Sequence, residues 1–268
     1  MIQFSDKKLI IGMIHVQALP GTPNHKLSIA EISALAVKEA RQYEKAQIDA
    51  IIIENMHDVP YMKGQVGPEI TAAMTLVAKA IRDVVSLPLG IQILAGANKE
   101  ALAVAKAADL DFIRAEGFVF GHVADEGYID SCAGELMRYR KAISAEKVKV
   151  FTDIKKKHSS HAITSDVDIV ETAHAAEFFL SDGIIITGSS TGKAVDIREL
   201  DALKDTVRQP ILIGSGITVD NIAEYWDFAQ AFIVGSHFKE SAYWMNPLSD
   251  DRLDAFMERV KFLRTQNK

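Results

Sequence analysis

The 268-residue sequence has a single cysteine, Cys132, and no long apolar segment. A disulfide within the chain needs two cysteines and a cysteine metal cluster needs more, so both are excluded. No run of ~18 apolar residues is free of charge, and the apolar start of the chain is too short for a membrane span and has no signal-peptide cleavage pattern. We therefore expect a cytoplasmic protein without stable membrane insertion.

The sequence also has no excess of basic residues. It contains 30 Lys and Arg residues and 36 Asp and Glu residues, which give a formal net charge of -6. A general nucleic-acid binder usually carries a basic face, so this balance argues against that class and leaves room for a local anion site. Apolar residues are plentiful, at 48% of the chain. That is enough for a well-buried core and excludes a disordered chain.

Eight short runs rich in Ile and Val recur along the sequence, and most of them are nearly continuous in hydrophobicity. Such runs are typical of parallel strands that are buried on both faces. They span residues 9–14, 50–53, 89–94, 111–115, 148–154, 183–187, 210–214 and 231–235.

Helix-like segments alternate with these strands. The first follows Ser28, which forms an S-x-x-E capping box with Glu31, and the others span residues 69–85, 99–108, 135–144, 167–180, 197–204, 219–225 and 250–264. Eight strand–helix units predict an α/β protein, a closed (β/α)8 TIM barrel with residues 1–268 in a single domain. The alternative is an open doubly wound sheet, but its usual Gly-x-Gly-x-x-Gly turn is missing, since residues 15–21 read HVQALPG.

Glycine and serine follow the last two predicted strands. Gly214, Ser215 and Gly216 form one turn, and Gly235 and Ser236 form the other. Small residues let backbone N–H groups approach an anion, and barrels often bind phosphate at this pair of turns. We therefore predict a phosphate site here, against the alternative that the glycines only make tight turns. The polar run 187–192 either contributes donors to the same ligand or is a flexible loop.

Polar side chains stand where several strands leave the apolar interior. Residues i and i+2 of a strand point to the same side, which is the spacing of Arg114 with Glu116 and of Asp153 with Lys155. We expect a ring of acids, bases and amides at the barrel mouth, with Glu54 or Asp153 as base and Lys155 as electrostatic stabiliser. The predicted catalytic residues are Glu54, His57, Glu116, Asp153 and Lys155, and the predicted substrate-binding residues are His15, Asn55, Gln92, Arg114, Thr187 and Gly188.

Histidines leave the question of a metal open. His57 is either a general acid or base oriented by Asp58, or a metal ligand together with Glu54. His158 and His161 form an H-S-S-H pattern, but it lacks a helical H-E-x-x-H frame and a third ligand. The sequence therefore allows a divalent metal without indicating one, and the cofactor is unknown.

Six segments together resemble the BtpA family, which includes SgcQ-type proteins. They read GMIHVQALPGTP at residues 12–23, ENMHDVPY at 54–61, QILAGAN at 92–98, IRAEGFVF at 113–120, DIKKKHSSH at 153–161 and GSGIT at 214–218. The likeness covers essentially the whole chain, and the first, second and fifth segments are specific. The resemblance implies a ribulose-phosphate-binding TIM barrel. It links the founding members to photosystem I biogenesis or stability and the SgcQ-type members to carbohydrate genes, and it implies no particular reaction.

Three functions follow as hypotheses. The leading one is an enzyme that acts by acid/base chemistry on a small phosphorylated sugar or sugar-phosphate derivative, as an isomerase, epimerase, lyase or glycosidic hydrolase. The first alternative is a non-enzymatic biogenesis or stability factor for a membrane complex of the photosystem I type, and the second is a sugar-phosphate-binding regulator. The expected partners are a small phosphorylated ligand and no nucleic acid, and a homo-oligomer is left open.

Overall fold

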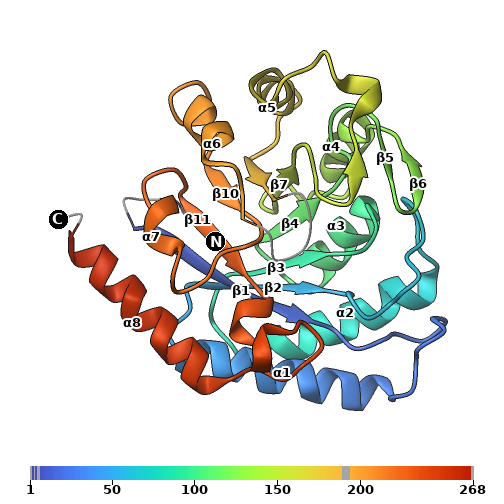
Figure 1. Cartoon of the computed structure of the whole chain (residues 1–268). Helices are drawn as coiled ribbons and strands as arrows, with labels where there is room; N and C mark the ends of the chain where they lie inside the picture. Colours follow the sequence, from blue (N-terminus) through green and yellow to red (C-terminus); the bar gives the residue numbers. More distant parts are fainter. Residues whose placement is uncertain (1, 3, 5–6, 189–193, 267–268) are drawn as a thin grey trace.

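Eight parallel strands close into a barrel in the computed structural model, which describes residues 2, 4, 7–188 and 194–266 (Figure 1). Strand β1 pairs with both β2 and β11, which closes the ring. The predicted (β/α)8 barrel is thus confirmed, and each strand lies within its predicted run or extends one residue beyond it. In order around the barrel the strands are β1 (Leu9–His15), β11 (Ala231–Val234), β10 (Ile211–Ile213), β9 (Gly183–Ile186), β7 (Lys149–Asp153), β4 (Phe112–Ala115), β3 (Leu89–Gln92) and β2 (Ala50–Glu54).

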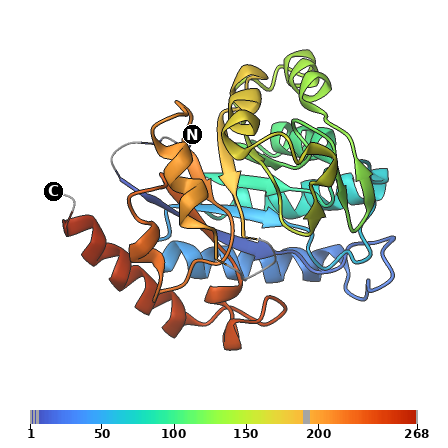
Figure 2. The same cartoon turned by 45° about the horizontal axis from the view of Figure 1, so that its top comes forward.

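Helices cover the outside of the barrel (Figure 1, Figure 2). The predicted capping box forms at the first of them, where the Ser28 hydroxyl accepts the Glu31 N–H and the Glu31 carboxylate accepts the Ser28 N–H at 2.8 Å. Within the described ranges, no helix combines the length and hydrophobicity needed to cross a membrane. The helices are α1 (Ile29–Lys45), α2 (Pro68–Arg82), α3 (Asn98–Ala107), α4 (Ala133–Ala142), α5 (Ile169–Phe178), α6 (Ile197–Lys204), α7 (Ile222–Tyr225) and α8 (Asp250–Gln266).

A second sheet of three short strands joins two long loops, and the sequence patterns did not predict it. Strands β5 (His122–Ala124) and β6 (Gly127–Ile129) come from the loop after β4, and β8 (Ser159–Ser160) comes from the loop after β7. Both β6 and β8 pair antiparallel with β5. Strands of two or three residues are too short to show an alternation of hydrophobicity. Three 3₁₀ helices complete the described elements: η1 (Ala162–Thr164), η2 (Ser236–Phe238) and η3 (Glu240–Ala242).

Large and small side chains alternate in the barrel interior. The rings of Phe112 and Phe151 lie with their centroids 5.4 Å apart, and each faces a glycine of a neighbouring strand. A Cβ atom on Gly90 would lie 2.2 Å from the Phe112 ring, and one on Gly183 would lie 3.0 Å from the Phe151 ring. Near the N-terminus, Phe4 packs edge-on against Phe151 with centroids 5.5 Å apart. The other interior residues are Ile2, Leu9, Ile11, Met13, Ala50, Ile52, Ile185, Leu212, Ala231 and Ile233.

The inward-facing positions of the strands, which we call the interior series, continue to the mouth of the barrel. Successive residues of a strand point to opposite sides, so the inward positions Met13 and Ile52 continue two residues later into His15 and Glu54. Phe112 is likewise followed by Arg114, at the same spacing. The polar ends of the strands therefore point into the same space as the apolar interior and form its upper layer.

We expect Gly90→Ala to destabilise the barrel, because its methyl group would overlap the Phe112 ring, which Phe151 holds in place. Overpacking of this kind should lower the free energy of unfolding by about 1–3 kcal/mol, measured by urea denaturation. The control is Gly134→Ala in α4, where the nearest neighbour is the flexible end of Arg138 at 3.3 Å and alanine favours the helix. Equal unfolding midpoints for Gly90→Ala and the unchanged protein would contradict this packing.

Candidate functional site

A cavity of about 430 Å³ opens at the carboxyl end of the barrel. Met13 and Ile233 of the interior series line its base, and Met56, Tyr61 and Leu94 add apolar surface. Its volume is in the range of sites that bind small metabolites. Of the predicted site residues, the cavity brings together His15, Glu54, Gln92, Arg114, Glu116, Gly214, Ser215, Gly216, Gly235 and Ser236.

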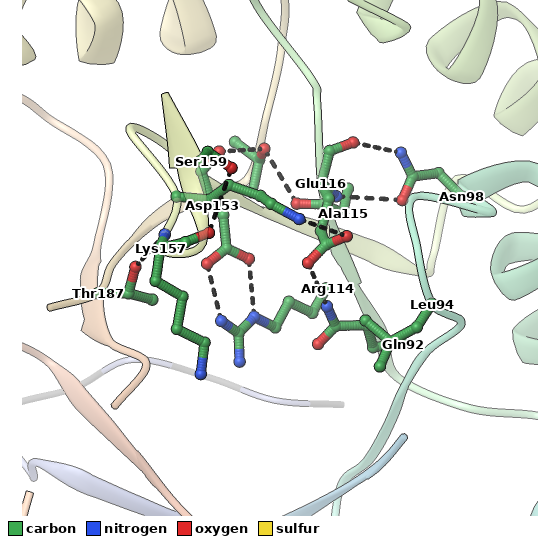
Figure 3. Close-up of polar contacts among 12 residues, drawn as sticks. Gln92, Leu94, Asn98, Arg114, Ala115, Glu116, Asp153, Lys157, Ser159 and Thr187 are labelled. Atoms are coloured by element: carbon green, nitrogen blue, oxygen red, sulfur yellow. Dashed lines mark hydrogen bonds and ion pairs between the residues drawn. The ribbon is translucent and has the colours of Figure 1, made fainter. Parts of the chain in front are cut away.

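A buried ion pair joins β4 to β7 beside this cavity. Arg114 donates from Nε and Nη2 to the two carboxylate oxygens of Asp153, both at 2.7 Å (Figure 3). The two side chains are only 5% and 1% exposed. Two parallel charge-assisted bonds fix both groups in position. Asp153, predicted as a base, therefore has both oxygens engaged and serves to position Arg114.

A second ion pair lies at the end of β4. Lys156 Nζ is 3.2 Å from Glu116 Oε2, and Gln92 Nε2 donates to Glu116 Oε1 at 3.1 Å. The side chain of Asn98 holds the backbone of Glu116, accepting its N–H at 3.1 Å and donating to its carbonyl at 2.7 Å. Glu116 is thus held in the site with its charge neutralised by Lys156, which the sequence patterns did not single out.

Lys155, predicted as the cation of the site, is directed elsewhere. The alternation of β7 breaks after Asp153, because Lys155 adopts a left-handed conformation with φ of 49°. Its amino group donates to the carbonyl oxygens of Thr164 at 3.1 Å and Val167 at 2.6 Å, and it does not line the cavity. The expected role of Lys155 as electrostatic stabiliser therefore has no support in the geometry.

Lys157 faces the cavity in its place. Its N–H donates to the Thr187 hydroxyl at 3.1 Å, which ties the loop after β7 to the end of β9. Its side chain extends alongside Arg114, with no interaction drawn to its amino group (Figure 3). Burial, and next the positive charge of Arg114, lower the pKa of Lys157. A lysine in this setting is suited to chemistry as a neutral amine.

Glu54 is the buried carboxylate that these ion pairs leave without a partner. Three buried acids and three cations gather at the mouth, and the Arg114–Asp153 and Lys156–Glu116 pairs use four of them. The more exposed Asp125 and Glu126 also line the cavity. Among the described residues, neither the Glu54 carboxylate nor the Lys157 amino group has a hydrogen bond or ion pair, although both line the cavity. Burial raises the pKa of Glu54, against the opposing effect of the nearby cations. A carboxyl group tuned in this way can exchange protons nearer neutral pH.

His15 also lines the cavity, and His57 does not. His15 Nδ1 lies 3.0 Å from the carbonyl oxygen of Trp244, and burial, followed by the charge of Lys239, lowers the pKa of His15 to about 3. His57 lies against the Trp244 ring with centroids 4.7 Å apart, and its nearest polar partner is Gln17 at 3.5 Å. His15 is thus a neutral imidazole at the site.

Asn55, predicted to bind substrate, instead braces two loops. Its Nδ2 donates to Asp58 at 2.8 Å, and its Oδ1 accepts the Leu94 N–H at 2.7 Å. The other oxygen of Asp58 accepts the Leu19 N–H at 2.8 Å. Asp58 is therefore bound to Asn55 and Leu19, and it does not orient His57 as the sequence suggested.

The turns after β10 and β11 offer donors to an anion. Among the described residues, the backbone N–H groups of Ser215, Gly216 and Ser236 have no hydrogen-bond acceptor, and all three residues line the cavity. Gly216 has φ of 76°, a conformation that favours glycine. Helix α7 begins at Ile222, beyond the residues of this turn that line the cavity.

The first of these turns is shaped by its neighbours. A Cβ atom on Gly214 would lie 2.6 Å from Ile185 and 3.1 Å from the Arg114 guanidinium, so glycine here leaves room for Arg114. The Ser215 hydroxyl accepts the Gly188 N–H at 3.1 Å and so joins the ends of β9 and β10. Thr187 and Gly188, predicted to bind substrate, thus hold Lys157 and Ser215 in place and do not line the cavity themselves. Residues 189–192 of the predicted polar run lie outside the described residues.

The described part of the chain holds no group of three His, Cys, Asp or Glu side chains arranged to bind a metal ion. His158 lines the main cavity, whereas His161 lines a small separate pocket with His122, their ring centroids 5.4 Å apart. The H-S-S-H pattern therefore does not direct its two histidines to one place.

Comparison with known proteins gives a family match over nearly the whole chain. The model described as the BtpA family matches residues 6–262. A Caenorhabditis elegans protein described as mitochondrial is 50% identical over 97% of this chain and 95% of its own length. The photosystem I biogenesis protein BtpA of Synechocystis is 30% identical over 96% of this chain and 89% of its own length.

Solved structures support the fold at much lower sequence identity. Thiamine phosphate pyrophosphorylase from Pyrococcus furiosus superposes with a TM-score of 0.57 at 14% identity, covering 96% of each chain. Phosphoribosylanthranilate isomerase from Thermotoga maritima superposes with a TM-score of 0.57 at 14% identity, covering 95% of this chain and 98% of its own. At this identity the likeness shows a shared barrel fold and nothing finer.

His15 should make the protein less stable in acid. Its folded-state pKa of about 3 lies below the ordinary value of 6.5, so the unfolded chain binds a proton that the folded chain does not. Stability from this group is complete above pH 6.5 and falls as the pH drops toward 3, by up to about 1.4 kcal/mol per pH unit. His15→Gln should therefore gain stability relative to the unchanged protein between pH 6.5 and 4.5, measured by urea denaturation.

The difference in stability between His15→Gln and the unchanged protein reports on His15 alone. The raised pKa of Glu54 acts in the opposite direction, since a carboxyl group with a raised pKa stabilises the folded state as the pH falls, but it is present in both proteins. A stability difference that does not change between pH 6.5 and 4.5 would show that His15 takes up a proton in the folded state.

Proposed function

This chain belongs to the BtpA family, and we propose that it is an enzyme that transforms a small phosphorylated sugar, or a sugar-phosphate derivative, by acid/base chemistry. The observation that carries the proposal is the pair of groups left without partners, the Glu54 carboxylate and the Lys157 amino group, which face one cavity. Its position at the carboxyl end of the barrel strands is where active sites of this fold are built.

The phosphate would bind at the turns after β10 and β11. Among the described residues, Ser215, Gly216 and Ser236 line that part of the cavity and have N–H groups without an acceptor. Backbone N–H groups are effective donors to phosphate. The names of the two superposed barrels, which both include a phosphorylated compound, are consistent with this use of the fold. The net charge of -6 does not oppose it, because these donors are local.

The sugar would then lie over Glu54 and Lys157. Glu54, with its raised pKa, exchanges a proton with a carbon or hydroxyl of the sugar, and Arg114 and Lys157 stabilise negative charge that develops on oxygen. Glycosidic hydrolysis usually needs two carboxyl groups, and Asp125 and Glu126 line the cavity in addition to Glu54. The reaction classes therefore stay an isomerase, epimerase, lyase or glycosidic hydrolase.

A second candidate is a non-enzymatic assembly or stability factor. The name of the Synechocystis relative, a photosystem I biogenesis protein, is the observation that favours it. In that case the partnerless Glu54 and Lys157 would be dispensable, although burying charge without a partner is costly. A cytoplasmic location also stays a proposal, since the nematode relative is described as mitochondrial.

Phosphorylated ligands should raise the melting temperature, whereas the same sugars without phosphate should not. We expect ribose 5-phosphate, ribulose 5-phosphate or a nucleoside monophosphate at about 100 times its Kd to add about 2.7 kcal/mol, which is a rise of roughly 5–10 °C for a chain of this size. A thermal-shift screen with and without divalent metal measures this effect.

Gly216→Asp should abolish that rise, because it places a carboxylate among the N–H groups that hold the phosphate. The matched control is Gly64→Asp, since Gly64 has a similar φ of 73°, does not line the cavity and has open space around it. If the ligand raises the melting temperature of Gly216→Asp as much as that of the unchanged protein, the phosphate does not bind at these turns.

Glu54→Gln should lower turnover of the stabilising compound by about 10²–10⁴-fold, because glutamine cannot exchange the proton, while the ligand-induced rise in melting temperature is kept. Glu135→Gln, an exposed carboxylate paired with Lys99, is the control and should keep full turnover. The assembly-factor candidate predicts instead that Glu54→Gln restores full function in cells that lack the protein, and that result would contradict the enzyme proposal.

A further inference from the structure

We propose that Lys157 is a nucleophile that forms an imine with the carbonyl group of the substrate, which restricts the substrates to phosphorylated aldehydes and ketones. This inference deepens the proposed function and rests on it, since it uses the same cavity. It assigns to Lys157 a covalent role that goes beyond stabilising charge.

The three consecutive lysines after β7 are used in three different ways. Lys155 donates to two backbone carbonyl groups, and Lys156 pairs with Glu116. Of the three, Lys157 alone presents an amino group to the cavity without a hydrogen bond or ion pair among the described residues. A largely buried amino group kept only for its charge is normally paired with a carboxylate, whereas the partly buried Lys157 has no such partner among the described residues.

Arg114 makes the neutral form of Lys157 accessible. Its guanidinium group is held rigidly by two bonds to Asp153 and is close enough to Lys157 to disfavour a second positive charge. Burial is the larger effect and acts in the same direction, so that burial and Arg114 together lower the pKa of the lysine against the smaller opposing effect of Glu54. A neighbouring cation and desolvation are the two established ways of activating a lysine as a nucleophile.

The backbone at Lys157 is also fixed. Its N–H group donates to the Thr187 hydroxyl at 3.1 Å, and Thr187 follows directly on β9. This bond ties the backbone at Lys157 to the barrel and limits its movement when a substrate enters. Rigid placement of a nucleophile beside its substrate supplies a large part of the rate of such a reaction.

The chemistry balances with groups present at the site. The lone pair of the neutral Lys157 amine attacks the carbonyl carbon, the C=O π electrons move to oxygen, and one N–H proton is transferred to that oxygen to give a carbinolamine. Glu54, in its protonated form, then gives a proton to the hydroxyl group, which leaves as water while the nitrogen lone pair forms the C=N bond. The products are a protonated imine, one water molecule and the Glu54 carboxylate, and hydrolysis reverses each step.

The protonated imine withdraws electrons and thereby weakens the C–H and C–C bonds at the adjacent carbon. The Glu54 carboxylate formed in this way can remove a proton from that carbon, which leads to isomerisation. It can also remove a proton from a hydroxyl group on the next carbon, which leads to cleavage of the C–C bond between these two carbons. Both outcomes belong to the isomerase and lyase classes among the proposed reactions.

Trapping with sodium cyanoborohydride tests the assignment. Dihydroxyacetone phosphate and ribose 5-phosphate are the probes, and dihydroxyacetone and ribose are their matched controls without phosphate. We expect one reduced adduct per chain on the peptide that contains Lys157, formed at least about tenfold faster with the phosphorylated probes, because charge-assisted bonds to phosphate hold them in the site. Intact mass and peptide mapping measure both results.

Three variants give the controls. Lys157→Met and Lys157→Arg should lose the adduct, and Lys157→Arg keeps the charge in case the methionine variant does not fold. Lys155→Met should be labelled like the unchanged protein, because its amino group lies outside the cavity. An adduct on some other lysine, or equal labelling of Lys157→Arg, would overturn the assignment.

The same experiment separates the imine from the proposed function. If phosphorylated sugars stabilise the protein and are turned over but leave no adduct on Lys157, the imine is overturned and acid/base catalysis by Glu54 stands. If the phosphorylated probes neither stabilise the protein nor label it, both proposals fail.

Discussion

The two hydrogen bonds between Arg114 and Asp153 fix what every other group at the barrel mouth can do. They hold a permanent cation at the end of β4, and a side chain at Gly214 would crowd this cation as well as Ile185. Burial and the same cation lower the pKa of Lys157. Since Asp153 is engaged in this bond and Glu116 in the pair with Lys156, Glu54 is the buried carboxylate left to exchange protons. Removing either partner would leave a buried charge unpaired, which typically costs about 3–5 kcal/mol.

The barrel and most of the cavity could be predicted from the sequence, because both depend on patterns local to each strand. Continuous apolar runs mark strands buried on both faces, and polar residues at their carboxyl ends must share the mouth of a closed barrel. That reasoning gave Glu54, Gln92, Arg114 and Glu116, which all line the cavity. It failed at Lys155, because strand alternation holds only while the backbone stays extended, and Lys155 leaves that conformation.

What could not be predicted depends on contacts between distant segments. The pairing of β5 with β8 joins residues more than thirty positions apart, and neither segment is long enough to mark itself as a strand. Asn55 was predicted to bind substrate because it follows β2, but its partners, Asp58 and the Leu94 N–H, make it a brace between loops. The distinction among three consecutive lysines likewise comes only from the fold, which gives each one a different environment.

We propose that one cavity holds a phosphate at the turns after β10 and β11 and a sugar over Glu54 and Lys157. A crystal structure of the protein with ribose 5-phosphate is the sharpest test of this arrangement. We expect phosphate oxygens within hydrogen-bond distance of the N–H groups of Ser215, Gly216 and Ser236, with the sugar in reach of Glu54. A phosphate bound outside this cavity, or held by Lys156 with the two turns empty, would contradict it.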